Sequence, residues 1–272
     1  MGGPRPSIPV EVRRRLRQEV NFGCPVPGCG VPYLTYHHFD PPWRAEHHFR
    51  PEGMIALCHT HADLADGDRW TTDQIRAFKS NPFVTSGQLS ADFGYLRRRV
   101  VCRIGNLAWD VHDVLTINGE RVIGFERDPE GYDRLNVRIC GLNGGVILEM
   151  VDNDWTVLTD DLHDLNCGAQ GKELRFELED GLTDFRMRFD DLAPEAFVRE
   201  LCPTFEEDEV RQVVSTLGTP ASVPLWTINA TLQWGVSRIE INDSEIRFGR
   251  GSSLAVSFFH NCGSALALNV LT

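Results

Sequence analysis

The first third of the chain alternates short apolar runs with turn-forming and charged stretches. Pro9 precedes the run VEVRRRLRQEV, in which apolar residues recur at helical spacing among arginines, so this run predicts a short helix. Residues 71–82 predict a second helix, because a threonine can cap its start, Ile75 and Phe78 share a face, and Pro82 ends it. The segment between them is rich in Gly and Pro, and we expect mostly loop and turn there.

From Trp109 onward the pattern is that of a β protein. The run DVLTINGERVIGF places an Asn-Gly pair between two apolar stretches, which is typical of a β-hairpin. RLNVRIC, ELRFEL and FRMRF alternate apolar and polar residues, as half-buried strands do. A helical pattern over residues 192–217 interrupts the strands, and the last 30 or so residues give short strands separated by Asn, Gly and Ser. We therefore expect an α+β chain whose larger, β-rich part is a sandwich or a short β-solenoid.

The charge of the chain changes at the same place as the pattern. The net charge is −12, but residues 1–108 carry 14 Lys and Arg against 10 Asp and Glu, a net of +4, whereas residues 109–272 carry 13 against 29, a net of −16. Such asymmetry predicts domains with different partners. We place a first domain at 1–85, a basic connector at 86–108 and an acidic β-rich domain at 109–272. The first could bind a polyanion, which the last should repel.

Composition indicates where in the cell the protein would lie. No apolar run approaches the roughly 18 residues that span a membrane, and the N-terminus lacks the apolar core of a signal peptide. The eight cysteines are too few and too scattered for a disulfide scaffold. We therefore expect a cytoplasmic protein without a membrane partner.

Four residues near the N-terminus have the spacing of zinc ligands. Cys24 and Cys29 lie on a Gly/Pro-rich loop, and Cys58 is followed three residues later by His61. Two short-spaced pairs of this kind can close a tetrahedral shell without an open position, so the metal would be structural. Because the region is poor in large apolar residues, we expect it to need such a metal in order to fold. The alternative is two unrelated pairs of buried side chains.

Two adjacent histidines, His37 and His38, are not needed for that zinc shell. Neighbouring residues on an extended strand point to opposite sides, so one ring can bind a second metal while the other faces a substrate. A cation that neutralises phosphate charge and an imidazole that takes a proton from water are what metal-assisted hydrolysis requires. Taken alone, such a pair can equally be structural.

Together these motifs resemble a known family. The cysteine pair, then HHF, PEGMIALC and a helix with AD followed by DQIRAFK, resemble the zinc-stapled bacterial branch of the HNH endonucleases over residues 12–82. The resemblance implies a ββα-metal fold whose helix lies along the DNA minor groove. It implies that His37 is a ligand of the catalytic Mg²⁺ or Mn²⁺ and that His38 is the general base. It also places the structural zinc on Cys24, Cys29, Cys58 and His61.

The chain departs from the family pattern at two positions. The asparagine that braces the loop of the general base would lie near Gly53, and the last catalytic His or Asn falls on Ala62, which can bind nothing. Either the copy is naturally inactive, or Asp66, one helical turn later, replaces the missing ligand, or Ala62 is an engineered change, the explanation that we favour. We expect His47 and His48 to be exposed loop residues.

The leading hypothesis is a metal-dependent DNA endonuclease in restriction or antiviral genome defence, by analogy alone and impaired if Ala62 has no substitute. Five arginines could contact phosphate, although an arginine run is equally typical of a solvated helix face. They are Arg13, Arg14, Arg17, Arg44 and Arg50. The acidic domain would then sense, restrain or oligomerise the nuclease, as a homo-oligomer or with a regulatory protein.

Two other classes of function compete with the nuclease hypothesis. The first part could be a zinc finger that binds nucleic acid or protein without cutting, which Ala62 favours. The β-rich part could instead act on carbohydrate, although no pair of carboxylates stands out from its acidic background.

Overall fold

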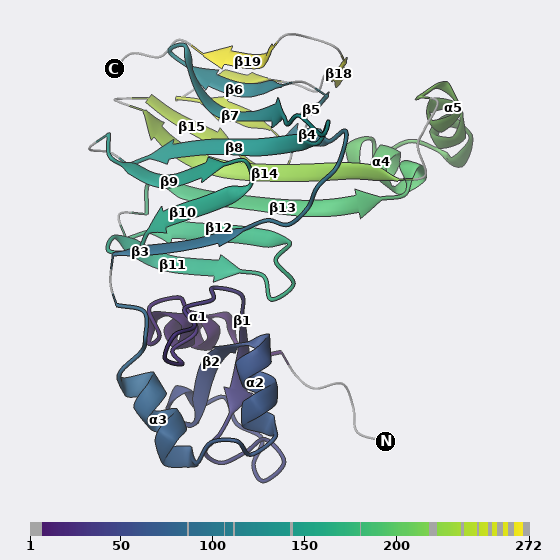
Figure 1. Ribbon diagram of the computed structural model, residues 1–272. Helices are drawn as coiled ribbons and strands as arrows, with labels where there is room; N and C mark the ends of the chain where they lie inside the picture. The colour runs from purple at the N-terminus through teal and green to yellow at the C-terminus, as the bar shows by residue number, and fades with distance from the viewer. Residues whose placement is uncertain are drawn as a thin grey trace. The chain divides into compact units, whose positions relative to one another are not determined.

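The chain packs into two compact units in this computed structural model (Figure 1). Unit 1 comprises residues 1–91 and 158–179, and unit 2 comprises residues 92–157 and 180–272. The structure describes residues 7–85, 87–105, 107–110, 112–141, 144–179, 181–217, 222–234, 237–243, 245–249, 252–254, 258–260 and 264–268.

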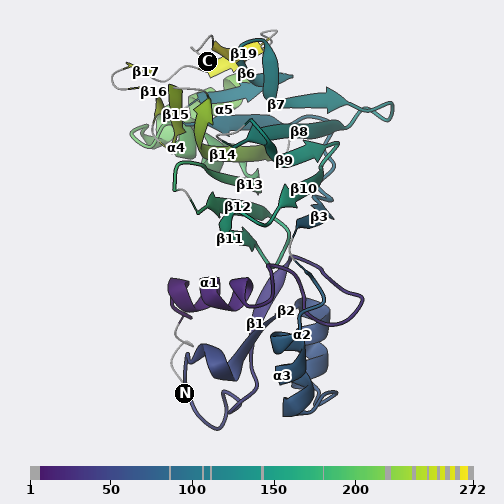
Figure 2. The same cartoon turned by 90° about the vertical axis from the view of Figure 1, so that its left-hand side faces the viewer.

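Unit 1 is built around two strands and three helices. Its elements are α1 (Val10–Gln18), β1 (Leu34–His38), the short 3₁₀ helix η1 (Pro51–Gly53), β2 (Met54–Cys58), α2 (His59–Asp66) and α3 (Thr72–Ser80). β1 and β2 pair antiparallel, with Leu34 opposite Cys58 and His38 opposite Met54. α2 follows β2 directly and packs on both strands, so these elements form a ββα arrangement (Figure 2).

Both helices predicted in this region are confirmed. α1 begins directly after Pro9. α3 begins with a capping box, in which the Thr71 side chain accepts from the backbone N–H of Gln74 and the Gln74 side chain accepts from the backbone N–H of Thr71. These elements are set by local signals that lie within a few residues of the helix ends.

Unit 1 has a larger apolar core than its sequence suggested. All five residues of β2 are buried, and they pack with residues of α1, α2 and α3 such as Leu16, Ala65 and Ile75. We expected this region to have too few apolar residues to fold without zinc, but it has an apolar core of its own. A metal would add to this core rather than replace it.

A hairpin from the β-rich part of the sequence belongs to unit 1. It consists of β11 (Leu162–Cys167) and β12 (Glu173–Leu178), paired antiparallel. α1 packs against β11, and the side-chain amide of Gln18 donates to the carbonyl oxygen of His163 at 2.7 Å. The sequence-based boundaries placed these residues in the domain at 109–272 and did not predict that they pack with unit 1.

Unit 2 is made of two mostly antiparallel sheets. In one, the strand order is β19–β6–β7–β8–β9–β10, and in the other it is β13–β14–β15–β16–β17. The first comprises β6 (Asp113–Ile117), β7 (Glu120–Arg127), β8 (Asp133–Cys140), β9 (Val146–Val151), β10 (Asp154–Leu158) and β19 (Ser264–Leu268). The second comprises β13 (Asp184–Leu192), β14 (Val223–Trp234), β15 (Ser237–Ile241), β16 (Ile246–Phe248) and β17 (Ser252–Leu254).

Further strands and two helices complete unit 2. β4 (Val101–Ile104) pairs parallel to β14 and antiparallel to β5 (Leu107–Asp110), which pairs in turn with β18 (Phe258–His260). The predicted helical interruption is confirmed as α4 (Pro194–Leu201) and α5 (Glu207–Leu217). Residues 86–108, expected as a basic connector, contain β4 and β3 (Gln88–Asp92).

The chain is therefore α+β and β-rich, as predicted, and its described strands close no barrel. The Asn-Gly hairpin is confirmed, because Asn118 and Gly119 both have positive φ, 51° and 82°, between β6 and β7. β14 to β17 pair antiparallel and are hairpins rather than solenoid rungs. Among the described residues, no helix is long and apolar enough to cross a membrane.

Candidate metal centre and neighbouring cleft

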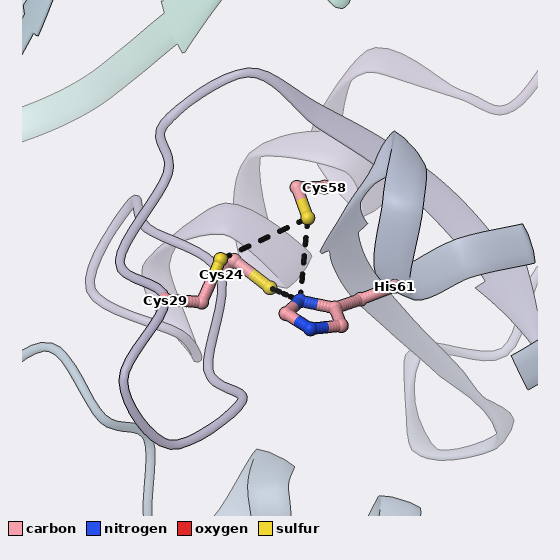
Figure 3. Close-up of side chains that lie close together, drawn as sticks. All are labelled: Cys24, Cys29, Cys58 and His61. Atoms are coloured by element: carbon pink, nitrogen blue, oxygen red, sulfur yellow. Dashed lines mark hydrogen bonds between the residues drawn. The ribbon is translucent and has the colours of Figure 1, made fainter. Parts of the chain in front are cut away.

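Cys24, Cys29, Cys58 and His61 converge on one point in unit 1 (Figure 3). Their ligand atoms all lie within 4.8 Å of one another. The Nδ1 atom of His61 lies 3.2 Å from the sulfur of Cys24 and 3.3 Å from that of Cys58, and the sulfurs of Cys29 and Cys58 are 3.8 Å apart. Two of these residues lie on the loop after α1, one ends β2 and one lies in the first turn of α2.

These distances fit a tetrahedral metal site. With Zn–S bonds of about 2.3 Å and a Zn–N bond of about 2.0 Å, tetrahedral geometry requires S···S edges of about 3.8 Å and S···N edges of about 3.5 Å. The loop that carries the first two cysteines is held by its own backbone, since Cys24 N–H donates to Val31 O at 2.9 Å and Gly30 N–H donates to Cys24 O at 3.2 Å. The group could therefore hold a zinc-like ion.

Burial governs the protonation of these ligands. It raises the pKa of the Cys24 and Cys58 thiols, and the charge of Cys29 adds to the rise at both. It also lowers the pKa of His61, to which the charge of Arg69 adds. The imidazole is therefore neutral and able to accept a cation, whereas the thiols must release protons when one binds.

Beside this cluster lies a cleft of about 510 Å³, lined by β1, the loop after it and α2. His37 and His38 from β1, Arg44 from the loop, and Ala62 and Asp66 from α2 all contribute to its walls. The residues that the family resemblance assigned to catalysis, apart from the zinc ligands, thus meet in one cavity.

His37 faces α2 and contacts the carboxylate of Asp66. Its Nδ1 atom lies 2.9 Å from Asp66 Oδ1; the His37 side chain is 11% exposed and that of Asp66 is 72% exposed. Burial lowers the pKa of His37, and the Asp66 carboxylate opposes part of this shift. Ala62, one turn before Asp66, is buried and offers no ligand atom. His37 and Asp66 therefore form a pair of groups in the cleft that could share a cation.

His38 faces the other way, into the loop after β1. It is 5% exposed, and its Nε2 atom lies 2.9 Å from the carbonyl oxygen of His48. Its ring also packs against Trp43 and Phe49, with centroids 4.9 and 6.3 Å away. When Nε2 carries the proton and donates it to this carbonyl, Nδ1 is the basic nitrogen of the ring.

His48 has a role that the sequence did not reveal. We expected an exposed loop residue, but His48 is 6% exposed. Its Nε2 atom lies 3.0 Å from Pro41 O, and its Nδ1 atom accepts from the backbone N–H of Arg50 at 3.1 Å. His48 thus ties together the two ends of the loop that holds His38. No spacing signal distinguishes it from exposed His47, which stacks on Trp43 with centroids 4.4 Å apart.

The family resemblance predicted a bracing asparagine near Gly53, where the chain has none. The carbonyl oxygen of Gly53 accepts from the backbone N–H groups of Phe39 and Asp40 at 3.0 and 3.2 Å. A Cβ atom here would lie 1.9 Å from the carbonyl oxygen of Asp40, so only glycine permits this approach. Backbone atoms of Gly53 and the ring of His48 together hold the loop in place of an asparagine side chain.

Two of the five arginines predicted to contact DNA are structural. Arg17 is 5% exposed and binds the Asp164 carboxylate through Nε and Nη2, at 2.9 and 2.5 Å. The guanidinium of Arg14, whose side chain is 19% exposed, lies near Glu11, Asp164 and Glu177. We no longer assign a phosphate contact to either.

The other three arginines differ in exposure and in whether they already form an ion pair. Arg44 is exposed and lines the cleft. Arg50 is exposed and binds Glu46 through Nη1 at 2.5 Å, and Arg13 is half-buried. Arg44 is therefore the predicted phosphate contact best placed to act in the cleft.

Comparison with protein-family models, with curated proteins and with solved structures gives no match for this chain. The resemblance to HNH endonucleases therefore rests on the sequence motifs alone.

Proposed function

We propose that unit 1 is a metal-dependent nuclease that hydrolyses phosphodiester bonds in DNA. One observation carries the proposal: a single cleft beside the Cys₃His cluster brings together His37, Asp66 and His38 on a ββα arrangement. This combination of a candidate cation site and a buried histidine is what hydrolysis of a phosphodiester by activated water requires.

Each of the cleft residues would have a separate role in the proposed reaction. Asp66 and neutral His37 would hold a Mg²⁺ or Mn²⁺ ion, whose charge would stabilise the pentavalent phosphorus and the leaving oxygen. His38, held by the His48 carbonyl, would take a proton from the attacking water through Nδ1. Arg44 would bind a phosphate oxygen at the mouth of the cleft.

Unit 2 would regulate this nuclease rather than bind its substrate. Unit 2, residues 92–157 and 180–272, carries 15 Lys and Arg against 24 Asp and Glu, a net charge of −9, which disfavours contact with DNA. We propose that it senses a signal or forms an oligomer or a complex with a regulatory protein. A place in restriction or antiviral defence follows from the analogy with HNH enzymes.

Plasmid nicking tests the proposal directly. The full chain, freed of loosely bound metal, should nick supercoiled DNA when Mn²⁺ or Mg²⁺ is added, and His38→Ala should reduce the rate at least roughly 100-fold, the lower end of the effect of a general base. His47→Ala is the matched control, because it removes an exposed histidine from the same loop. Ala62→His should raise the rate by adding a ligand one turn from Asp66. Nicking that survives His38→Ala unchanged would refute the mechanism.

A zinc-stapled binding module is the second candidate. Ala62 favours it, since a binding module needs no metal ligand at that position. In this case the chain would retard DNA or a protein partner in a gel shift, and neither added cation nor Ala62→His would produce nicking.

A further inference from the structure

One part of the cleft in unit 1 has no role in the reaction proposed above. The loop between α2 and α3, residues 67–71, lines this cleft with the side chains of Asp68 and Trp70. We propose that this part of the cleft binds one unpaired base of the DNA strand that unit 1 cuts, with a preference for guanine, and this proposal rests on the proposed nuclease function.

The loop between α2 and α3 is held at both ends. At its start, the backbone N–H of Asp68 donates to Ala65 O at 3.1 Å. Asp68 has a φ of 55°, in the left-handed region that aspartate tolerates better than most residues. At its end, the capping box of Thr71 fixes the entry into α3. Asp68 and Trp70 are therefore presented by a short loop with a defined backbone path.

Trp70 offers an aromatic surface to the cleft. It is half-buried, packs against the apolar core of unit 1 and lines the cleft. The rings of His61 and Phe78 contact it with centroids 5.6 and 5.3 Å away, at interplanar angles of 53° and 84°, so neither ring is stacked parallel to the indole. Trp43, which also lines the cleft, is already stacked with His47 at an angle of 15°. Trp70 is therefore better placed than Trp43 to receive a further flat ring.

Asp68 supplies a hydrogen-bond acceptor two residues before this ring. It is exposed and lines the cleft, and among the residues that the structure describes its carboxylate has no ion pair or hydrogen bond. An ionised carboxylate can only accept, so it selects a ligand that carries N–H groups. An unpaired guanine presents two neighbouring donors, N1–H and the N2 amino group, to the two oxygens of one carboxylate. The other three bases present a donor at a single position of the same edge, so we expect guanine to be preferred.

A base inside a duplex could use neither of these groups. Both of its faces are covered by the neighbouring base pairs, and its Watson–Crick donors are bonded to the opposite strand. Contact with a tryptophan face and with a carboxylate on that edge therefore requires a base outside the stack. Single strands offer such bases without the cost of opening a duplex. The preferred substrate is therefore single-stranded or locally opened DNA.

The size of the cleft and the position of the loop agree with this substrate. The volume of about 510 Å³ falls within the range of about 300–1,000 Å³ that is typical of small-molecule sites. Asp66, the proposed cation ligand, comes two residues before Asp68, and Arg44 lines the same cleft. A nucleotide whose base stacks on Trp70 would therefore have its phosphate in the same cleft as the groups proposed to cut it.

Binding of short DNA strands to the full chain, measured by anisotropy and tryptophan fluorescence without added divalent cation, tests the proposal. The main probe is a dT strand with one central dG. The comparison probes are its duplex, the same strand with deoxyinosine in place of dG, and free dGMP. We expect the dG strand to bind about five-fold or more tightly than its duplex and than the deoxyinosine strand, which lacks only the N2 amino group. Free dGMP should bind more weakly than the strand, because it lacks the neighbouring phosphates.

Two variants with matched controls locate the base. Trp70→Leu keeps an apolar side chain on the core, but it should weaken binding of the dG strand about five-fold or more and remove the fluorescence quenching that a stacked base causes. Phe83→Leu, at a 50% exposed aromatic residue outside the cleft lining, should leave binding unchanged. Asp68→Asn should reduce the difference between the dG and deoxyinosine strands, and asparagine also tolerates the left-handed backbone there. Asp73→Asn, at an exposed residue of α3, should keep that difference.

The possible results separate the base site from the nuclease activity. If the duplex or dGMP binds as tightly as the dG strand, or if Trp70→Leu binds like Phe83→Leu, the base site is overturned even where Mn²⁺-dependent nicking persists. If the dG strand binds with quenching that depends on Trp70 and no DNA is cut when Mn²⁺ or Mg²⁺ is added, the base site is supported and the nuclease activity is refuted.

Discussion

Replacing Asp164 by asparagine should destabilise unit 1, because it leaves a buried guanidinium without its counter-charge. Asp164 is 8% exposed and receives two hydrogen bonds from Arg17, which is 5% exposed and also donates to the Tyr36 hydroxyl. This pair joins α1 to β11 across 147 positions of the chain. Among the described ion pairs between α1 and the hairpin of β11 and β12, the Arg17–Asp164 pair is the most deeply buried.

The size of the effect follows from burial. Removing one partner of a buried ion pair typically costs about 3–5 kcal/mol, because the other charge stays desolvated. Asparagine keeps the shape of Asp164 and can still accept one bond, so we expect the lower end, about 3 kcal/mol. Replacing both partners, as in Arg17→Met with Asp164→Leu, should recover most of this loss, since no unpaired charge then remains.

Urea denaturation at fixed zinc concentration measures the effect. With an m-value of about 2 kcal/mol per M, the loss corresponds to a midpoint about 1.5 M lower. Asp160→Asn is the control, because Asp160 lies exposed just before β11. If Asp164→Asn unfolds at the same urea concentration as Asp160→Asn, the pair is not desolvated and the reasoning about α1 is wrong.

Three further predictions concern the metal, a histidine and a glycine. Elemental analysis should find one zinc per chain, and Cys58→Ser should lose it. His37 should titrate below 6.5 by NMR, since burial lowers its pKa, so its contribution to stability is complete above that pH and is lost as the pH falls through its folded pKa; a stability profile in which His37→Gln keeps the same acid sensitivity would contradict this. Gly53→Ala should cost about 2 kcal/mol or more, because its Cβ would overlap a carbonyl oxygen, whereas Gly67→Ala, with its nearest atom at 3.5 Å, should change stability little.

Local signals account for the parts of the fold that the sequence predicted. The Thr71 capping box, the helix start after Pro9 and the Asn118-Gly119 turn each depend on residues within four positions of one another. The ligands of the metal cluster were also predicted, because they come in two pairs spaced by five and three positions, Cys24 with Cys29 and Cys58 with His61. Capping and turn signals of this kind depend on the local backbone geometry and not on distant parts of the chain.

Features that depend on distant segments were not predictable in this way. The hairpin of β11 and β12 has the alternating pattern of any half-buried strand pair, and nothing in that pattern shows that it joins unit 1 rather than its sequence neighbours. His48 is similar, because its burial follows from the path of the whole loop between β1 and β2. Its ring contact with Pro41 and its carbonyl contact with His38 depend on that path, and only its ring contact with Arg50 is local.

The arginine run of α1 shows how this limit affects inference about function. In the sequence, Arg13, Arg14 and Arg17 are equivalent candidates for phosphate contacts, since each has a flexible side chain on a short amphipathic helix. In the structure, the carboxylate of Asp164 on β11 binds the buried guanidinium of Arg17 and lies near that of Arg14. Arg17 is therefore no longer a candidate, and Arg14 is a weaker one. If unit 1 binds DNA, its positive surface must therefore lie nearer to Arg44, at the cleft, than to α1. Neutralising Arg44 should then weaken DNA binding more than neutralising Arg15, which is exposed on α1 and pairs with Glu19 and Glu52.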